Sequence, residues 1–158
     1  CRPNGKVGTR NYLAVLSNVN CSASVAHYIA RRFNTDEWKA KYPHVDGVLA
    51  FSHGNGCGMP FGGEHHQILN RVIGGMGKHA NIGGYLIIGL GCETGTIGSL
   101  IDSTQLVQIR GHETPQRPPV LVMQDLGGTQ NTIDAGMKLV AAMMRRVAEA
   151  SRDTGPAR

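Results

Sequence analysis

The sequence is poor in aromatic and charged residues and contains no long apolar run. Aromatic residues make up 5 % and charged residues 17 % of its 158 positions, whereas charged residues reach about 25 % in an average globular protein. The longest apolar stretch, around residues 85–90, is far shorter than the roughly 20 residues that span a membrane. No secretory leader is recognisable at the start of the sequence. We therefore expect neither a membrane partner nor secretion.

Clustered basic charge is also missing. The 16 lysines and arginines outnumber the 11 acidic residues and give a net charge of +5. Arg31-Arg32 and Arg145-Arg146 are the adjacent basic pairs, and no aromatic residues are interleaved with them as they are in nucleic-acid binders. The charge therefore favours a small anionic ligand, and we expect no nucleic-acid partner.

Glycine is in excess, with 22 of the 158 residues, about twice the usual share of ~7 %. These glycines follow no Gly-X-Y repeat, and hydrophobic residues make up 41 % of the chain. Collagen and disorder are therefore excluded. The length corresponds to one domain, which we place at residues 1–150, with residues 151–158 as a tail or linker.

Four short apolar runs lie at residues 12–17, 47–52, 85–90 and 120–124. They are continuous rather than alternating, which is typical of parallel strands buried on both faces. Helical periodicity follows each run, at residues 22–33, 64–76, 96–101 and from residue 129 or 131 to 150, and a short turn of helix is expected within residues 35–43. This alternation predicts a three-layer α/β/α domain, Rossmann-like or flavodoxin-like, with a mainly parallel sheet of four or five strands. Residues 106–109 are the candidate for a fifth, edge strand.

The helix predicted at residues 64–76 also has a predicted orientation. Its apolar residues recur at helical spacing and are expected to face the sheet; they are Ile68, Leu69, Val72, Ile73 and Met76. His65 and His66 open this helix and are expected to be solvated or to act as local capping groups.

Three cysteines follow three different strands. Cys21, Cys57 and Cys92 each lie a few residues past a predicted strand and just before a helix, in glycine-rich segments. Because ligands of open parallel sheets bind at the carboxyl ends of the strands, we expect the three cysteines to converge on one edge. The helix N-termini behind them offer free N–H groups that suit carboxylate or phosphate.

The side chains at this edge allow several kinds of chemistry. Thiols are soft metal ligands, and His53 and Glu93 supply an imidazole and a carboxylate close by in sequence. Each cysteine can alternatively serve as a small buried hydrophobic residue. Disulfides are not expected, since nothing indicates an oxidising compartment, and the reduced cytoplasm is the predicted location.

The motifs in these segments resemble those of the altronate dehydratase/galactarate dehydratase family. They are Gly5-Lys6-Val7-Gly8-Thr9-Arg10-Asn11, Asn20-Cys21-Ser22-Ala23-Ser24-Val25, His53-Gly54-Asn55-Gly56-Cys57-Gly58-Met59, Gly89-Leu90-Gly91-Cys92-Glu93 and Gly127-Gly128-Thr129. The resemblance covers nearly the whole chain in order. Two departures fall within it, because Asn55 replaces a small hydroxyl residue and Thr94-Gly95 replaces a more polar pair.

The resemblance implies a hydro-lyase that acts on sugar acids with a divalent metal, typically Fe2+, with Mn2+ or another divalent ion as substitutes. It implies that this chain corresponds to the middle domain of a larger polypeptide, so that other domains are its partners and the domain alone is inactive. A homo-oligomer is also expected. The motifs do not distinguish altronate from galactarate as substrate, and they allow a sulfolactate sulfo-lyase of the same family.

The resemblance also suggests a role for each edge residue. Dehydration removes the proton next to a carboxylate and expels the β-hydroxyl, giving a 2-keto-3-deoxy acid. We assign catalysis to His53, Cys57 and Glu93, metal binding to Cys21, Cys57 and Cys92, and substrate binding to Arg10, Asn20, Ser22, Gly128 and Thr129. Three alternatives stay open: a structural zinc or iron–sulfur module, a nucleotide-binding module, and a scaffold for a catalytic neighbouring domain.

Overall fold

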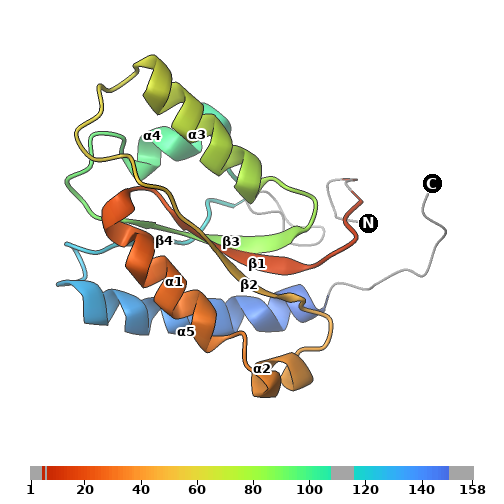
Figure 1. Ribbon diagram of the computed structural model, residues 1–158. Helices are drawn as coiled ribbons and strands as arrows, with labels where there is room; N and C mark the ends of the chain where they lie inside the picture. The colour runs from red at the N-terminus through yellow and green to blue at the C-terminus, as the bar shows by residue number, and fades with distance from the viewer. Residues whose placement is uncertain (1–4, 6, 108–115, 150–158) are drawn as a thin grey trace.

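Four parallel strands form one sheet in the computed structural model, which describes residues 5, 7–107 and 116–149 (Figure 1). The strands are β1 (Tyr12–Ser17), β2 (Gly47–Phe51), β3 (Ile82–Gly89) and β4 (Val120–Val122). Their order across the sheet is β2-β1-β3-β4, and every neighbouring pair is parallel. The two central strands, β1 and β3, are therefore covered on both faces and both edges.

Helices cover both faces of the sheet. A short 3-10 turn (Asn20–Ser22) leads into α1 (Ala23–Arg32), and the other helices are α2 (Asp36–Lys41), α3 (Glu64–Gly77), α4 (Ile97–Thr104) and α5 (Thr129–Ala148). Helices α1 and α5 pack on one face, and α3 and α4 pack on the other (Figure 1). The predicted three-layer α/β/α architecture is confirmed.

The alternation of side chains along β1 creates two separate cores. Leu13 and Val15 join the cluster under α1 and α5, whereas Ala14 and Leu16 join the cluster under α3 and α4. All four side chains are at most 1 % exposed. A strand that is buried on both faces reads as a continuous apolar run, and this explains why β1 was predictable from residue 12 to residue 17.

The boundaries of the other elements differ modestly from the predicted ones. Strand β3 begins at Ile82 because Gly83 and Gly84, which interrupt the apolar pattern, are part of the strand. Gly84 faces Leu13 at a point where an added Cβ would lie 3.1 Å from that side chain. The predicted fifth strand is absent at residues 106 and 107, and residues 108 and 109 lie outside the described residues. Among the described residues, the sheet has four strands.

The predicted orientation of α3 is wrong for three of its five apolar residues. Ile73 faces the core as expected and Leu69 packs against it, but Ile68, Val72 and Met76 are 40, 51 and 38 % exposed. The buried face instead carries His66, Asn70, Ile73, Gly74 and Gly77. Glycine at 74 and 77 lets the helix approach its neighbours closely, because an added Cβ would lie 2.7 Å from Thr104 and 2.9 Å from Leu106 respectively.

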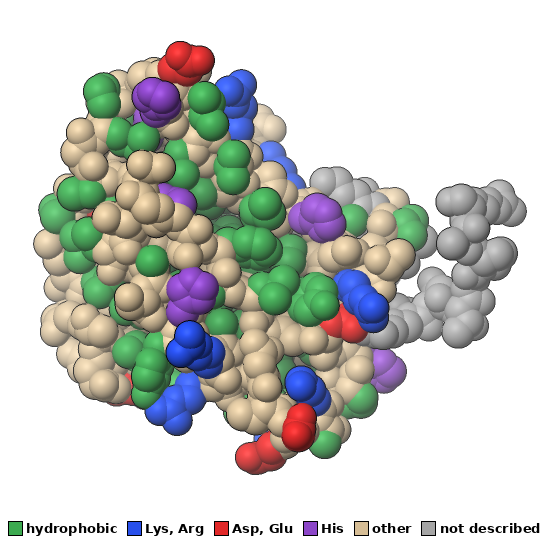
Figure 2. All heavy atoms as spheres, viewed as in Figure 1, with side chains coloured by type: hydrophobic (Ala, Val, Ile, Leu, Met, Phe, Trp, Pro, Cys, Tyr) green, Lys and Arg blue, Asp and Glu red, His purple; other side chains and the backbone are tan. Residues whose placement is uncertain are grey.

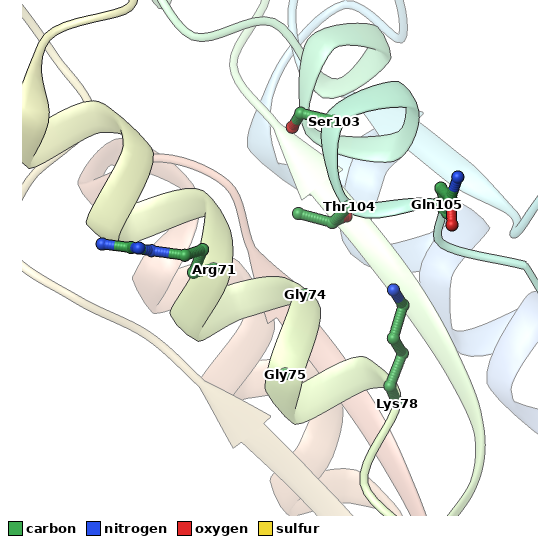
Figure 3. Close-up of a pocket in the computed structure, with 7 residues that line it drawn as sticks. All are labelled: Arg71, Gly74, Gly75, Lys78, Ser103, Thr104 and Gln105. Carbon is green, nitrogen blue, oxygen red and sulfur yellow. The ribbon is translucent and has the colours of Figure 1, made fainter.

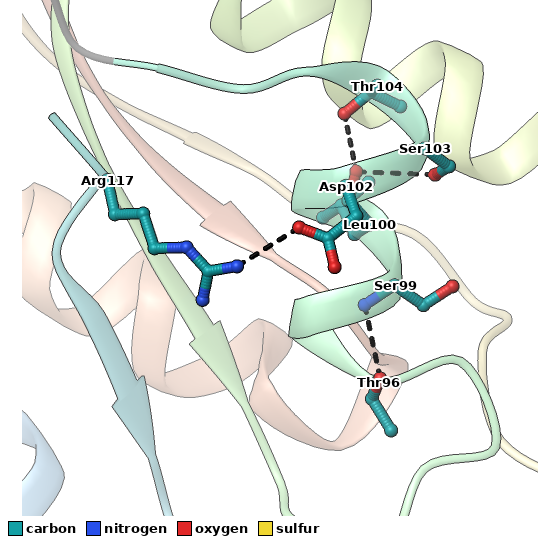
Figure 4. Close-up of polar contacts among 7 residues, drawn as sticks. All are labelled: Thr96, Ser99, Leu100, Asp102, Ser103, Thr104 and Arg117. Atoms are coloured by element: carbon teal, nitrogen blue, oxygen red, sulfur yellow. Dashed lines mark hydrogen bonds and ion pairs between the residues drawn. The ribbon is translucent and has the colours of Figure 1, made fainter. Parts of the chain in front are cut away.

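Helix α4 is fixed at both ends by side-chain hydrogen bonds (Figure 4). Thr96 caps its start, where the hydroxyl oxygen accepts a hydrogen bond from the Ser99 N–H at 3.2 Å. Ser103 and Thr104 donate to the Leu100 carbonyl in the last turn. Over the part of the chain that is described, no helix is both long and apolar enough to cross a membrane.

Candidate active-site edge

The strand order reverses direction between β1 and β3, which marks the expected position of a ligand crevice. The chain leaves β1 for β2 on one side and then crosses back to β3 on the other side. In open parallel sheets, ligands bind where the direction of the strand order reverses in this way, outside the carboxyl ends of the strands. The residues that follow β1 and β3 are therefore the first place to look for a site.

A buried amide and a buried carboxylate meet at this point. The Asn18 side chain, just past β1, donates to Glu93 Oε1 at 3.1 Å and to the Gly95 carbonyl at 2.8 Å. The Gly91 N–H donates to Glu93 Oε2 at 2.5 Å. Asn18 and Glu93 are only 4 and 8 % exposed. Both donors to the carboxylate are neutral groups, so Glu93 is held in place without an ion pair in these contacts.

The loop after β2 is joined to the loop after β1. The Asn20 N–H donates to the Asn55 carbonyl at 2.9 Å, and the His53 ring bonds to the Ser17 carbonyl at 3.0 Å. Gly56 has φ +98° and packs closely on Val19. A Cβ added to Gly56 would lie 3.0 Å from the Val19 Cα. The loops at residues 18–22, 53–58 and 91–95 are thus interlinked, and we call them together the cysteine edge. The loops that carry the cysteines thus lie together, whereas the convergence of the three thiols themselves stays a prediction.

Cys21, Cys57 and Cys92 are all exposed and free of disulfides. This exposure rules out the alternative that they act as buried hydrophobic residues. In the described ranges, however, no three or more His, Cys, Asp and Glu side chains are grouped so that they could hold a metal ion. A metal site made only of these residues therefore does not fit the geometry, and the assignment of the cysteines as ligands stays a prediction.

His53 is held as a neutral ring. Its Nδ1 accepts the Asn55 N–H at 3.2 Å, so the ring proton belongs on Nε2, which donates to the Ser17 carbonyl. Burial lowers the pKa of His53 from its usual value, although backbone hydrogen bonds oppose this shift. The ring is half-buried between the first two loops of the cysteine edge and is neutral at pH 7.

Ser22, a predicted substrate-binding residue, lies inside the fold and not on the surface of the cysteine edge. It is completely buried, and its Oγ bonds to the Val19 and Ile88 carbonyls and to Ser17 Oγ. Ser22 therefore ties the start of α1 to β3. Asn20, by contrast, is exposed at the cysteine edge, where its Oδ1 accepts a hydrogen bond from Cys21 Sγ at 3.4 Å.

Gly128 and Thr129 lie at the same edge, at the start of α5. The loop after β4 is joined to the loop after β3, because the Gln124 N–H donates to the Leu90 carbonyl at 2.9 Å. Gly128 has φ +111°, a conformation that favours glycine. Thr129 is exposed, so the first turn of α5 is accessible to an anion.

Arg10 is the one predicted site residue that lies at the amino ends of the strands, at the far side of the sheet from the cysteine edge. It precedes β1, and its guanidinium lies 3.6 Å from the carboxylate of Asp46, which precedes β2. The six residues of β1 separate it from the cysteine edge, a distance of about 20 Å at 3.3 Å per residue. Within this chain, Arg10 is therefore not brought together with Asn20 or Thr129.

Sequence reasoning missed His66. It is not solvated, since it is 4 % exposed, but the alternative of a local capping group agrees with the hydrogen bond that its ring accepts just before α3. Its Nδ1 accepts the Gly62 N–H at 3.2 Å, and its Nε2 is buried without a hydrogen-bond partner among the described residues. The ring lies directly against Gly95 of the cysteine edge, because a Cβ added to Gly95 would lie 2.5 Å from His66 Nε2. The helical spacing of His66 with Asn70, Ile73 and Gly77 was the available signal.

A surface pocket lies away from this edge, between the C-terminal ends of α3 and α4 (Figure 3). It has a volume of about 340 Å³ and is lined by Arg71, Gly74, Gly75, Lys78, Ser103, Thr104 and Gln105. Positive side chains are ordinarily stabilising at helix C-termini. Lys78, which directly follows α3, is explained in this way, whereas Arg71 lies in the middle of that helix. The pocket adds nothing to the site.

The fold and the cysteine edge define a doubly wound α/β domain whose candidate site lies at the carboxyl ends of its strands. A family model described as D-galactarate dehydratase/Altronate hydrolase, second domain, matches residues 1–148. The chain therefore belongs to the D-galactarate dehydratase/altronate hydrolase family, of which it is a second domain.

Two curated relatives agree with this assignment. The chain is 30 % identical over 154 residues to the altronate dehydratase of Escherichia coli (strain K12), a match that covers 98 % of this chain and 28 % of the relative. It is 29 % identical over 109 residues to the altronate dehydratase of Bacillus subtilis (strain 168), covering 69 % of this chain and 21 % of the relative. The chain thus spans less than a third of either protein. No solved structure matches it significantly.

Proposed function

We propose that this chain is a domain of a hydro-lyase that dehydrates a sugar acid of the altronate or galactarate class to a 2-keto-3-deoxy acid. The observation that carries the proposal is the buried Glu93 carboxylate at the strand-order reversal, in a chain of a dehydratase family. The two relatives named altronate dehydratase give the substrate class its support. A sulfolactate sulfo-lyase is the alternative that the motifs allow.

The reaction needs a base for the proton next to the carboxylate and an acid for the departing hydroxyl. Glu93 is a buried carboxylate that hydrogen bonds from Asn18 and Gly91 hold at the cysteine edge. His53 supplies a neutral imidazole, and its Nδ1 becomes available when the bond from the Asn55 N–H opens. Cys57 is the exposed thiol on the same loop as His53.

The substrate carboxylate needs hydrogen-bond donors. The first turn of α5, which begins at Thr129 after Gly128, offers unpaired N–H groups and the positive end of a 20-residue helix. The exposed Asn20 side chain lies at the same edge. In this proposal Arg10 and Ser22 have no part, because one lies at the far edge and the other is buried.

The divalent metal belongs to the proposal for the complete protein. Fe2+, or Mn2+ or another divalent ion in its place, would stabilise the negative charge that develops on the substrate. Because the described residues assemble no group that could hold a metal ion, no step is assigned to it here. Cytoplasmic location, a homo-oligomeric state and partner domains in the same polypeptide likewise remain predictions.

An activity assay of the complete protein tests this function. The full-length product of the reading frame would be assayed anaerobically with Fe2+ against altronate, galactarate and sulfolactate. Formation of a 2-keto-3-deoxy acid from one sugar acid supports the proposal and identifies the substrate. Release of sulfite from sulfolactate would select the sulfo-lyase instead. Inactivity on all three substrates by protein that retains iron would overturn the proposal.

A further inference from the structure

Helix α3 carries its large aliphatic side chains on the outside. Ile68, Val72 and Met76 follow one another at intervals of four residues, so they form a stripe along the helix, and they are 40, 51 and 38 % exposed. The opposite side, which faces the sheet, contains the polar His66 and Asn70. An ordinary surface helix has the reverse arrangement, with its apolar stripe against the core.

The apolar area continues beyond the helix. Phe61, in the loop before α3, is 63 % exposed. Leu49 and Phe51 belong to the outer strand β2 and are partly exposed. They pair with Ala14 and Leu16 of β1, whose side chains face the α3 side of the sheet. Figure 2 shows hydrophobic side chains along the course of α3 and onto the middle of this face, where β2 runs. We call Leu49, Phe51, Phe61, Ile68, Val72 and Met76 the α3 surface.

A surface of this kind indicates a partner. Single exposed apolar side chains are normal, but contiguous apolar patches on soluble proteins mark interaction sites. Charged residues are depleted at the centres of lasting interfaces, and Ile68, Val72 and Met76 form such an uncharged centre on α3. Scattered exposure does not account for a stripe that lies opposite the buried face of the same helix.

We propose that another domain of the same polypeptide packs on the α3 surface. The chain spans 28 and 21 % of its two curated relatives, so most of each relative lies outside the part that corresponds to this chain. A neighbouring domain in the same polypeptide is present at high effective concentration and needs no separate association. It is the occupant that the length of these relatives favours over a second copy of this chain.

The α3 surface leads directly to the cysteine edge. The Phe61 ring lies 5.0 Å from the His66 ring, centroid to centroid, and His66 Nε2 abuts Gly95. A domain on α3 therefore borders the loop that carries Cys92 and Glu93. The next step rests on the proposed function. In it, that domain supplies the metal-binding groups that the described residues do not assemble.

Hydroxyl-radical footprinting of the full-length protein tests the docking without reference to activity. We expect Phe61 and Met76 to be labelled at least fivefold more slowly, relative to their intrinsic reactivity, than Tyr28 on the opposite layer, which is 44 % exposed in the structure. Val72→Asp should restore their labelling, whereas Lys138→Asp, at an exposed position of α5, should leave the protection intact.

Two results would overturn the proposal. Labelling of Phe61 and Met76 as fast as that of Tyr28 would show that the surface is open. Protection that is lost on dilution, in step with dissociation of an oligomer, would assign the surface to a second copy. Absence of turnover would count against the proposed function alone, because the footprint is read without substrate.

Discussion

Asn18 and Glu93 lie 75 residues apart in the chain and are joined by a hydrogen bond of 3.1 Å between the carboxyl ends of β1 and β3. The same Asn18 amide holds the Gly95 carbonyl, so one side chain organises the entire third loop of the cysteine edge. A buried amide with two acceptors is costly to replace, since each acceptor left without a donor is destabilised by about 1–3 kcal/mol.

Asn18→Asp should therefore destabilise the chain by about 2–4 kcal/mol, because it removes both donated hydrogen bonds and places a second carboxylate beside Glu93. Urea unfolding followed by circular dichroism measures the loss. Asn20→Asp is the matched control, since Asn20 is exposed two residues away, and it should change stability by less than about 0.5 kcal/mol. Equal effects of the two variants would contradict the role given to Asn18.

Glu93→Gln in the full-length protein should lower kcat by about 10²–10⁴-fold if Glu93 transfers a proton. Glutamine keeps the size of the side chain, so the fold should remain intact. Steady-state kinetics with the active substrate provides the measurement, and the neighbouring exposed Thr94→Ala is the control. A kcat close to that of the wild type would instead make this domain a scaffold for a catalytic neighbour.

Gly95→Ala should lower the free energy of unfolding by about 1–3 kcal/mol, the usual range for overpacking. The new Cβ would lie 2.5 Å from His66 Nε2, so the buried ring would have to shift. His66→Ala removes the obstacle, so the double variant should be more stable than the sum of the two single effects predicts. A double-mutant cycle of unfolding free energies decides this, and strict additivity would show that the two residues do not touch in solution.

The stability of the chain should depend on pH through His53. Burial lowers its pKa below the value of 6.5 that applies to the unfolded chain, so the unfolded state binds the proton more readily. The stabilisation from the neutral ring is complete above pH 6.5 and is lost as the pH falls through the lower pKa of the folded state. Urea midpoints between pH 5 and 8 should fall less steeply for His53→Gln than for the wild type.

Thr96→Ala should destabilise the chain by about 1 kcal/mol, the usual effect of losing an N-cap. The Thr96 hydroxyl accepts the Ser99 N–H at the start of α4 (Figure 4). Thr94→Ala, at an exposed position that does not cap the helix, removes the same atoms and should be close to neutral. A thermal melt that shows the reverse ranking would exclude the cap.

The strands and helices were predictable because burial on both faces gives β1 a continuous apolar run, while helical spacing identifies α1 and α5. The convergence of the cysteine loops followed from one topological rule. The inward face of α3 was mispredicted, because the usual pattern for a surface helix places its apolar residues against the core. Gly74 and Gly77 face it instead, and the close approach to Thr104 and Leu106 that makes them necessary is visible only in three dimensions.

The structure places Ser22 and Arg10 away from the accessible surface of the cysteine edge, for different reasons. Ser22 looked like a ligand group because it follows a strand, but its hydroxyl satisfies the Val19 and Ile88 carbonyls inside the fold. Arg10 belongs to a motif that resembles the family, but this motif precedes the strand predicted at residues 12–17 and so already indicated the amino end of the sheet. Asp46, its partner across 3.6 Å, fixes Arg10 at the amino end.

The strand order has a consequence for synthesis on the ribosome. Strand β1 obtains its first neighbour, β2, when residue 47 is made, but its second neighbour, β3, begins only at residue 82. At roughly 5–20 residues per second, the 35 residues between these two starting positions take about 2–7 s to translate. For that interval the nascent chain has one strand edge without a partner, at the position where the ligand crevice later forms. A slowly translated codon between β2 and β3 would prolong this vulnerable stage.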